Sequence, residues 1–584
     1  MYDAAALYIA VSCVDQQPAT VAAQTTARDS FAVFSDDAIS VKIDAAHDQR
    51  TTVGFVLNPA GARLDYLGVN ESQMRREFDT TWQGAARRNA AGWTAEFRIP
   101  WRSLGIDPRD PPLRLGLNFS RDHPRRNATY DWALMPAPYS PISASLYGHL
   151  IGFEALAGLT RAALAKGTLD ASELDAVRGP PHGLRPWFLL GGKRERAGGD
   201  GAVNVGIADL GLDLAGQIAG RWRGQLTFNT DFAQVDVDDQ VVNLSRFSLF
   251  MPEKRDFFMR DVELFTFGQS GAAQLLHSRR IGLNGGTPVP IAVGAKALGQ
   301  VSDDVRLGIM QVTTRATGGL PATSNAVGRV LWELGGGSNL GLMWTHRQAL
   351  DRLDDVNTVL GVDGAWRSAA TPVLVEAFGV AGWTGAAARQ AAQDVGATAA
   401  SASDDAGVGT GVAVKASWRG LLWRPRLAWA WYDSDLRADL GFFRRVGVHE
   451  GSLGLAWEPR FASFGLEKLT VDTWAGVVRD GTNFDPLDAS AGISANLAWK
   501  LGHSLSLTAE RLSETVTEAF GVGGEARIDA GVYQMNRLSL GYGTPWVRRA
   551  AIQGSVTARE FYGGRMLSTY NSVVLRPGGM VRFE

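Results

Sequence analysis

The sequence is poor in residues that build covalent or metal-held frameworks. It has one cysteine, Cys13, among 584 residues, and its eight histidines are scattered along the chain. A single cysteine cannot form a disulfide within the chain, nor can it build a thiolate metal cluster. We therefore expect Cys13, which lies in an apolar stretch, to be a small buried hydrophobic residue.

The sequence also lacks a charge excess of one sign and long apolar runs. Its 58 Lys and Arg residues nearly balance its 60 Asp and Glu residues, so we expect no nucleic-acid partner. No run of about 18 apolar residues occurs, so the sequence predicts no transmembrane helix. A membrane is still possible, because transmembrane strands alternate and average to neutral hydropathy.

Motifs that would identify an enzyme are missing as well. The chain has no His-Glu-x-x-His pair, no Gly-x-Ser-x-Gly elbow and no phosphate loop. A glycoside hydrolase needs two carboxylates set across a cleft, and 60 acidic residues could meet that requirement anywhere. We therefore predict no catalytic residues, and the sequence leaves glycoside hydrolysis open.

Glycine and tryptophan are abundant, with 68 and 18 residues, which is typical of many strands and turns. A chain of this length is expected to form two or more units. Residues 1–155 contain short strands between turn clusters, and we predict an antiparallel β-sandwich. In it, Gly92–Pro100 is expected to form a hairpin with Gly54–Asn58 and to place Trp93 on its apolar face.

Residues 156–183 are predicted to form a linker, because a mildly helical stretch is followed by the Gly and Pro residues of 179–183. The pattern then changes in residues 184–584, where alternating strands follow one another at the length of about ten residues that a membrane barrel needs. Ala489, Ala491 and Ile493 share one face with Leu497, while the intervening residues are small and polar. A soluble sandwich or propeller also alternates, but the strand length favours a transmembrane β-barrel.

A charged and aromatic segment, residues 229–267, interrupts this pattern. We expect it to fold into or against the barrel. One interpretation is a structural network of paired charges, since charges buried in a lumen need partners. The other is a constriction that selects what passes through a pore. The structural interpretation is favoured, with a lumen network of Asp231, Asp236, Glu253, Lys254 and Arg255.

Tryptophans of the first unit are the candidates for ligand binding, because sugar rings stack on aromatic rings. Trp82 lies in a polar stretch and is the best candidate, followed by Trp101 and Trp132, whereas Trp93 is expected in the core. Asp36 and Asp37 could ligate a hard cation such as calcium, although adjacent acids more often form a solvated turn. We predict no other cofactor and no other metal site.

Two stretches resemble known families. Residues 2–154 resemble a family 9 carbohydrate-binding module in Tyr2, Asp3, Ala6 to Tyr8, Ser35 to Asp37, Phe55, Asn58, Pro59, Gly61, Gly92, Trp93, Glu96, Ile99, Pro100, Leu104, Arg125 to Asn127 and Trp132. Residues from about 184 onward resemble an outer-membrane barrel family called domain of unknown function 5916 in Asn229 to Asp236, Val242 to Leu244, Phe250 to Phe258, Phe265 to Gly268, Ser278 to Gly282 and Gly441 to Arg445.

The resemblance implies a Gram-negative outer-membrane protein with a sugar-binding type of module. It also implies that an opening strand and a secretion signal would precede Met1 and that final strands would follow Glu584, so we expect a chain truncated at both ends. The predicted fold is all-β: an N-terminal sandwich followed by a large antiparallel transmembrane barrel.

We predict non-enzymatic binding or passage of carbohydrate-like ligands, with outer-membrane lipid around the barrel. The alternatives are a glycoside hydrolase of carbohydrate catabolism that the module guides to its substrate, and a purely structural or assembly protein of the membrane.

Overall fold

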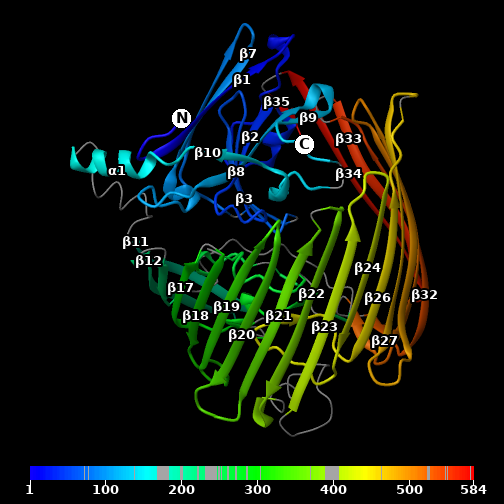
Figure 1. Cartoon of the computed structure of the whole chain (residues 1–584). Coiled ribbons are helices and arrows are strands. Elements are labelled where there is room, and N and C mark those ends of the chain that lie inside the picture. Colours follow the sequence, from blue (N-terminus) through cyan, green and yellow to red (C-terminus); the bar gives the residue numbers. More distant parts are fainter. Residues whose placement is uncertain are drawn as a thin grey trace.

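The computed structural model is an almost entirely β-stranded molecule with an N-terminal sandwich above a large curved sheet (Figure 1). It describes residues 1–71, 73–76, 78–136, 139–166, 183–196, 202–219, 222–229, 246–247, 250–251, 253–259, 262–269, 272–284, 287–302, 304–368, 370–388, 407–461, 463–522, 526–545, 548, 550–578 and 581–583. No helix in this part of the chain has the length and apolarity needed to cross a membrane.

The N-terminal unit, which we call the module, consists of two antiparallel sheets. The three-stranded sheet has the order β1 (Ala6–Val14), β7 (Gly92–Pro100) and β6 (Gln83–Asn89). The seven-stranded sheet has the order β10 (Gly148–Ile151), β8 (Arg114–His123), β2 (Ala38–Asp44), β3 (Thr52–Leu57), β4 (Arg63–Val69) and β5 (Gln73–Arg75), and β9 (Ala128–Asp131) pairs with β8.

Alternation along the strands explains how these two sheets pack. On β7 the side chains of Trp93, Ala95 and Phe97 point into the core between the sheets, as the pattern predicted, and Cys13 is buried there too. The predicted hairpin is wrong, because β7 pairs with β1 and β6 rather than with β3. The alternation on β7 determines which of its faces is buried, but not which neighbour it pairs with.

Helices are few and short. The module carries the 3-10 turns η1 (Pro18–Thr20), η2 (Phe31–Ser35), η3 (Trp101–Leu104), η4 (Pro124–Arg126) and η5 (Ala144–Leu146) and the helix α1 (Leu156–Ala165). Although α1 starts where the linker was predicted, its first residue, Leu156, is packed into the module core. Residues 167–182 lie outside the described residues.

The second unit is an antiparallel sheet of 19 strands in which every strand pairs with the next one along the sheet. The first strands are β11 (Gly183–Arg196), β12 (Ala202–Ala219), β13 (Trp222–Phe228), β17 (Ile291–Ser302), β18 (Val305–Thr314), β19 (Thr323–Gly335), β20 (Ser338–Ala349), β21 (Val356–Arg367), β22 (Val373–Thr384) and β23 (Gly407–Trp418). They continue as β24 (Trp423–Tyr432), β26 (Val448–Trp457), β27 (Leu466–Asp480), β28 (Pro486–Trp499), β29 (Ser504–Val516), β32 (Gly531–Gly543), β33 (Ala550–Phe561), β34 (Gly564–Gly578) and β35 (Val581–Phe583).

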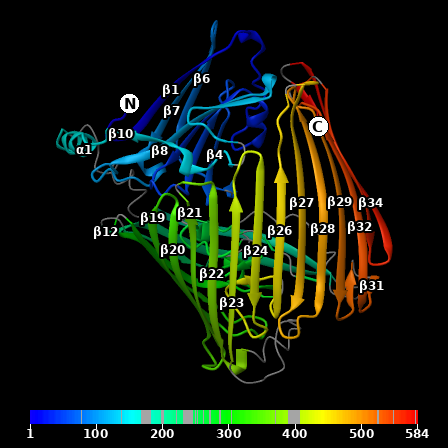
Figure 2. The ribbon, with the colours of Figure 1, turned by 45° about the vertical axis from the view of Figure 1, so that its right-hand side comes forward.

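This sheet curves into an open barrel (Figure 2). Within the described residues no pairing joins β11 to β35, so the barrel is not closed. Its outer face carries exposed apolar side chains on strand after strand, including Leu360, Ile493, Leu507 and Leu540. Exposed Trp residues gather where short turns join the strands: Trp332, Trp366, Trp418 and Trp423. The predicted all-β fold, a sandwich followed by a large antiparallel barrel, is confirmed.

Part of the chain between β13 and β17 folds inside the barrel and is called the internal segment. Its described elements are α3 (Asp256–Met259), β14 (Ala273–Gln274), η7 (Ser278–Arg280), β15 (Leu283–Asn284) and β16 (Thr287–Pro288). β14 pairs with β25 (Phe442–Phe443), which precedes β26, and a small hairpin of β30 (Phe520–Val522) and β31 (Ala526–Ile528) follows β29.

The internal segment packs against one half of the barrel wall. Phe257, Phe265 and Phe267 form one apolar core with inward-facing residues of the strands, such as Met310 and Met343. Glycine makes the close approach possible on β21, where a Cβ added to Gly361 would lie 2.5 Å from the Phe267 ring. The half of the barrel from β17 to β24 is therefore filled.

Candidate ligand-binding chamber

The barrel also encloses a cavity of about 550 Å³ that is lined by strands of both halves. Three parts of the chain surround it: the module around Glu71, the internal segment around Phe247, and the wall from β20 to β29. Its charged lining residues are Arg50, Glu71, Asp363, Arg367, Glu376, Lys415, Arg419, Arg444, Arg445, Glu450 and Asp488. Its aromatic lining residues include Phe247, Phe267, Phe378 and Tyr432. We call this cavity the chamber.

The inner wall beyond the chamber is polar. A second cavity of about 260 Å³ is lined by small and amide side chains of β28 to β34, among them Asn496, Ser506 and Gln553. Thr508 donates a hydrogen bond to Ser494 across β28 and β29 at 3.1 Å. Charged and polar groups inside and apolar groups outside are the arrangement of a barrel that encloses water in a membrane.

Of the residues predicted to form a lumen network, Glu253 and Arg255 pair with each other. Arg255, only 1% exposed, forms a two-point ion pair with Glu253, with distances of 2.8 and 3.0 Å from its nitrogens to the carboxylate. It also donates to the Ser278 and Ile281 carbonyl oxygens, at 2.8 and 2.9 Å. The backbone N–H of Lys254 donates to Glu253 at 3.0 Å. Asp231 and Asp236 lie outside the described residues.

The module covers the end of the barrel where the short turns are (Figure 1). One group of contacts centres on Arg306 of β18, which donates to Asp48 of the module at 3.2 Å and to Glu333 of β19 at 2.7 Å. Arg50 of the module reaches the same Glu333 at 3.5 Å. Burial raises the pKa of Asp48, but the charges of Arg306 and Arg50 outweigh it and hold this pKa below its usual range.

A second group of contacts centres on Glu71 of the module. Its carboxylate forms ion pairs with Arg367 of β21 and, at 3.2 Å, with Arg419 at the β23–β24 turn. The other carboxylate oxygen accepts a hydrogen bond from the Ser145 backbone N–H at 3.1 Å. Glu71 also lines the chamber, so the same residue attaches the module to the barrel and forms part of the ligand cavity.

Two of the three tryptophans predicted to bind sugar are in the module core. Trp82 is 2% exposed, stacks on Phe97 with ring centroids 5.7 Å apart, and donates to Asp65 at 3.0 Å. Trp101 is fully buried and donates to the Asp3 carbonyl oxygen at 2.9 Å. The prediction that these two rings face a ligand is corrected, because their faces are covered by other side chains. The polar sequence around Trp82 supplies its hydrogen-bond partner rather than an open surface.

Trp132 differs from the other two. It is 61% exposed and contacts Phe119 of β8 only at an edge, with centroids 6.1 Å apart. Of the predicted ligand-binding residues it is the one whose ring is open to solvent. No second exposed tryptophan lies opposite it among the predicted residues, so the structure does not bring the three candidates together.

The adjacent acids Asp36 and Asp37 are bound by different protein groups. Asp36 accepts from the Gln24 and Thr25 backbone N–H groups and from the Asn58 amide, at 2.8 to 2.9 Å. Asp37 forms an ion pair with Arg121 at 2.9 Å. Nitrogen donors occupy both oxygens of Asp36 and the Oδ1 atom of Asp37, and the Arg121 charge balances Asp37. This pair therefore does not fit the calcium site that the sequence left open.

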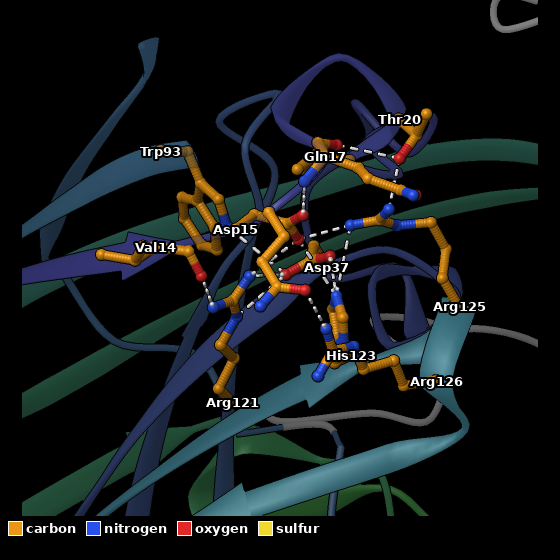
Figure 3. A network of polar contacts seen from close by, with 12 residues as sticks. Val14, Asp15, Gln17, Thr20, Asp37, Trp93, Arg121, His123, Arg125 and Arg126 are labelled. Carbon is orange, nitrogen blue, oxygen red and sulfur yellow. Dashed lines mark hydrogen bonds and ion pairs between the residues drawn. The ribbon is translucent and has the colours of Figure 1, made fainter. Parts of the chain in front are cut away.

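Asp37 belongs instead to a polar cluster that joins the two sheets of the module (Figure 3). Ligand atoms of Asp15, Asp37 and His123 lie within 4.8 Å of one another. Arg121 and Arg125 neutralise the two carboxylates, which removes the charge that a cation would need. Burial raises the pKa of Asp15. Hydrogen bonds from Gln17 and His123 and the charge of Arg125 outweigh this effect, so the pKa lies below its usual value.

Sequence reasoning missed the basic residues of the chamber. Arg444 and Arg445 end the Gly441 to Arg445 motif, which we used as a mark of resemblance and not as a candidate site. Arg367 and Lys415 lie on strands and Arg419 lies in the β23–β24 turn, and none of the three belongs to a motif. Only the curvature of the sheet and the position of the module bring these residues to one cavity.

The fold and the chamber define a class: a large antiparallel barrel of outer-membrane type with an internal segment and a sandwich module at one mouth. A family model described as "Domain of unknown function (DUF5916)" matches residues 208–301. This match supports the barrel resemblance for that stretch, whereas the likeness of residues 2–154 to a family 9 carbohydrate-binding module stays a prediction. No curated protein matches the chain.

Several solved structures are distantly similar to the chain. A bacterial polysaccharide outer membrane secretin shares 12% identity over 49% of this chain and 90% of its own, with a TM-score of 0.25. OccK11 (OpdR) of Pseudomonas aeruginosa shares 8% identity over 92% of this chain and 96% of its own, with a TM-score of 0.26. OccK8 (OprE) of the same organism shares 10% identity over 92% and 98%, also with a TM-score of 0.26.

Proposed function

We propose that this chain is an outer-membrane barrel protein that holds a polar, carbohydrate-like ligand in its chamber and passes it without changing it chemically. The chamber carries the proposal, because an enclosed space with charges of both signs and aromatic rings suits a ligand rich in hydroxyl groups. The outer wall supports a membrane location, since its exposed apolar band ends at a row of tryptophans.

The turn lengths support an orientation. The turns at 303–304, 336–337, 419–422 and 500–503 are short. The connections 315–322, 385–406, 433–447 and 517–530 at the other end are longer, and that end also has the short turns 481–485 and 562–563. Outer-membrane barrels place short turns in the periplasm and long loops outside the cell. The module, which docks at the short turns, is then a periplasmic cover of the barrel.

The ion pairs of the chamber carboxylates favour passage of the ligand over its hydrolysis. Asp363 is paired with Arg329, Glu376 with Lys415 at 3.6 Å, and Asp488 with Arg445. In the part of the chain that the structure describes, Glu450 is the chamber carboxylate without an ion pair. Glycoside hydrolysis by two carboxylates needs a second one free to act as acid or nucleophile.

The test compares neighbouring substitutions on β28 in full-length protein reconstituted into liposomes. Ser490 lines the chamber, and Ala491, the next residue, is exposed on the outer face. We expect liposomes with the unsubstituted protein to swell in monosaccharide solution. Ser490→Trp should cut the swelling rate several-fold, whereas Ala491→Trp should leave it unchanged. Liposomes that never swell and protein that binds no sugar would refute the proposal.

A further inference from the structure

Three guanidinium groups surround one phenylalanine ring at the edge of the chamber. Arg445 lies 4.6 Å, Arg444 5.0 Å and Arg246 5.1 Å from the centroid of Phe247. Arg246 and Phe247 belong to the internal segment, whereas Arg444 and Arg445 precede β26. Like charges this close repel one another unless acids balance them.

The acids beside this cluster balance two of the three arginines. Arg246 pairs with Glu514 at 3.3 Å and with Asp488 at 3.8 Å, and Arg445 also pairs with Asp488. The guanidinium of Arg444 has neither an ion pair nor a hydrogen bond to any residue that the structure describes. Its backbone N–H alone is bonded, to the Ala272 carbonyl oxygen at 2.9 Å. Arg444 is exposed, and it lines the chamber.

The other chamber cations already have acidic partners. These pairs are Arg50 with Glu333, Arg367 and Arg419 with Glu71, and Lys415 with Glu376. Glu450 is close enough to interact electrostatically with Arg444, but the two form no ion pair. Arg444 is therefore the described chamber cation that is left to meet a ligand.

We propose that the chamber binds the anionic group of its ligand at Arg444, and that the ligand is an acidic sugar or a comparable polar oxyanion. This inference rests on the proposed function, whose ligand class it narrows. A planar guanidinium offers paired N–H donors that match a carboxylate or phosphate. The Phe247 ring restricts the side chain beforehand, which lowers the entropy lost on binding.

The experiment measures the binding of glucose and glucuronate to the detergent-purified full chain by titration calorimetry. The two sugars have the same ring and differ in one carboxylate. We expect glucuronate to bind roughly tenfold more tightly than glucose, the difference that one charge-assisted hydrogen bond supplies. Arg444→Gln should abolish this preference for glucuronate, and Arg444→Lys should keep part of it.

Glu450→Gln is the matched control. It removes the opposing charge, so we expect glucuronate to bind more tightly than in the unsubstituted chain. Unchanged thermal unfolding and heat-modifiable migration of each variant will show that the barrel is intact. Competition by inorganic phosphate would assign the site to an oxyanion alone, and the absence of competition would assign it to an acidic sugar.

The outcomes separate the two claims. Equal binding of glucose and glucuronate, or glucuronate binding that survives Arg444→Gln unchanged, would overturn the anionic site and leave the proposed function standing. Binding of neither sugar would overturn this inference, and together with liposomes that never swell it would refute the proposed function as well.

Discussion

The two halves of the barrel wall have the same outer face and different inner faces. From β17 to β24 the inward side chains include Met310, Val327 and Met343, which the internal segment buries. From β28 to β34 the inward side chains include Asn496 and Ser506, which line an open cavity. The outer band is apolar in both halves. The outer face is thus apolar in both halves, and the inner face depends on what fills the lumen.

The module follows the same division. Its ion pairs reach Arg306, Glu333, Arg367 and Arg419, all of which belong to the filled half or its turns. Toward the open half, the module comes close to the barrel where Asn127 lies near Gly502. The filled half therefore contacts both the internal segment and the module, and the chamber lies where β20 to β24 meet β26 to β29.

The largest expected effect is the loss of the buried ion pair in the internal segment. Arg255→Ala leaves Glu253 buried and unpaired, which should lower the free energy of unfolding by about 3–5 kcal/mol. Arg537→Ala removes a half-exposed pair with Glu510 in the open half and should cost less than about 1 kcal/mol. Thermal and denaturant unfolding in detergent will measure both. Equal losses of unfolding free energy in the two variants would contradict the difference between the two halves.

A smaller effect is expected from charge placed on either face of β29. Leu507 is exposed on the outer face, so Leu507→Arg should cost about 2–4 kcal/mol in lipid. Its neighbour Thr508 faces inward, and Thr508→Arg should cost only about 1 kcal/mol for the lost hydrogen bond to Ser494. Urea unfolding in lipid vesicles compares the two variants. A greater loss for Thr508→Arg would contradict the outward assignment of Leu507.

The smallest effect concerns the docking of the module. In the docked module the pKa of Asp48 lies below the ordinary value of 3.8. The stabilisation of docking by Asp48 is therefore complete above that pH and is lost as the pH falls below it. Burial and the Asp48 charge raise the pKa of Asp44, so the neutral form of that neighbour persists to higher pH. We expect distances between spin labels on the module and the barrel to broaden below about pH 4.

Asp48→Asn supplies the control for the docking experiment. It should give the broad distance distribution already at pH 7, with no further change on acidification. A distribution that stays narrow from pH 7 to pH 3 in the unsubstituted chain would mean that Asp48 and Arg306 contribute little to docking.

The alternation of the strands could be predicted because it is a local property. The outward set on β28 and the core face of β7 follow from a period of two, whatever the neighbouring strands are. The partner of β7 could not be predicted, because pairing joins residues far apart in the sequence. Trp82 shows the same limit, since polar neighbours in sequence surround a ring that tertiary contacts bury.

The sequence by itself determined that this chain forms strands with one apolar and one polar face, because side-chain direction alternates along any extended backbone. Only the tertiary structure decided that the internal segment would pack against one half of the wall and that Arg444 would line the chamber without an ion pair to any described residue. The position of the module over the short turns was likewise decided there, by ion pairs such as Glu71 with Arg367 between residues nearly 300 positions apart. Such contacts depend on curvature and packing, which no local pattern encodes.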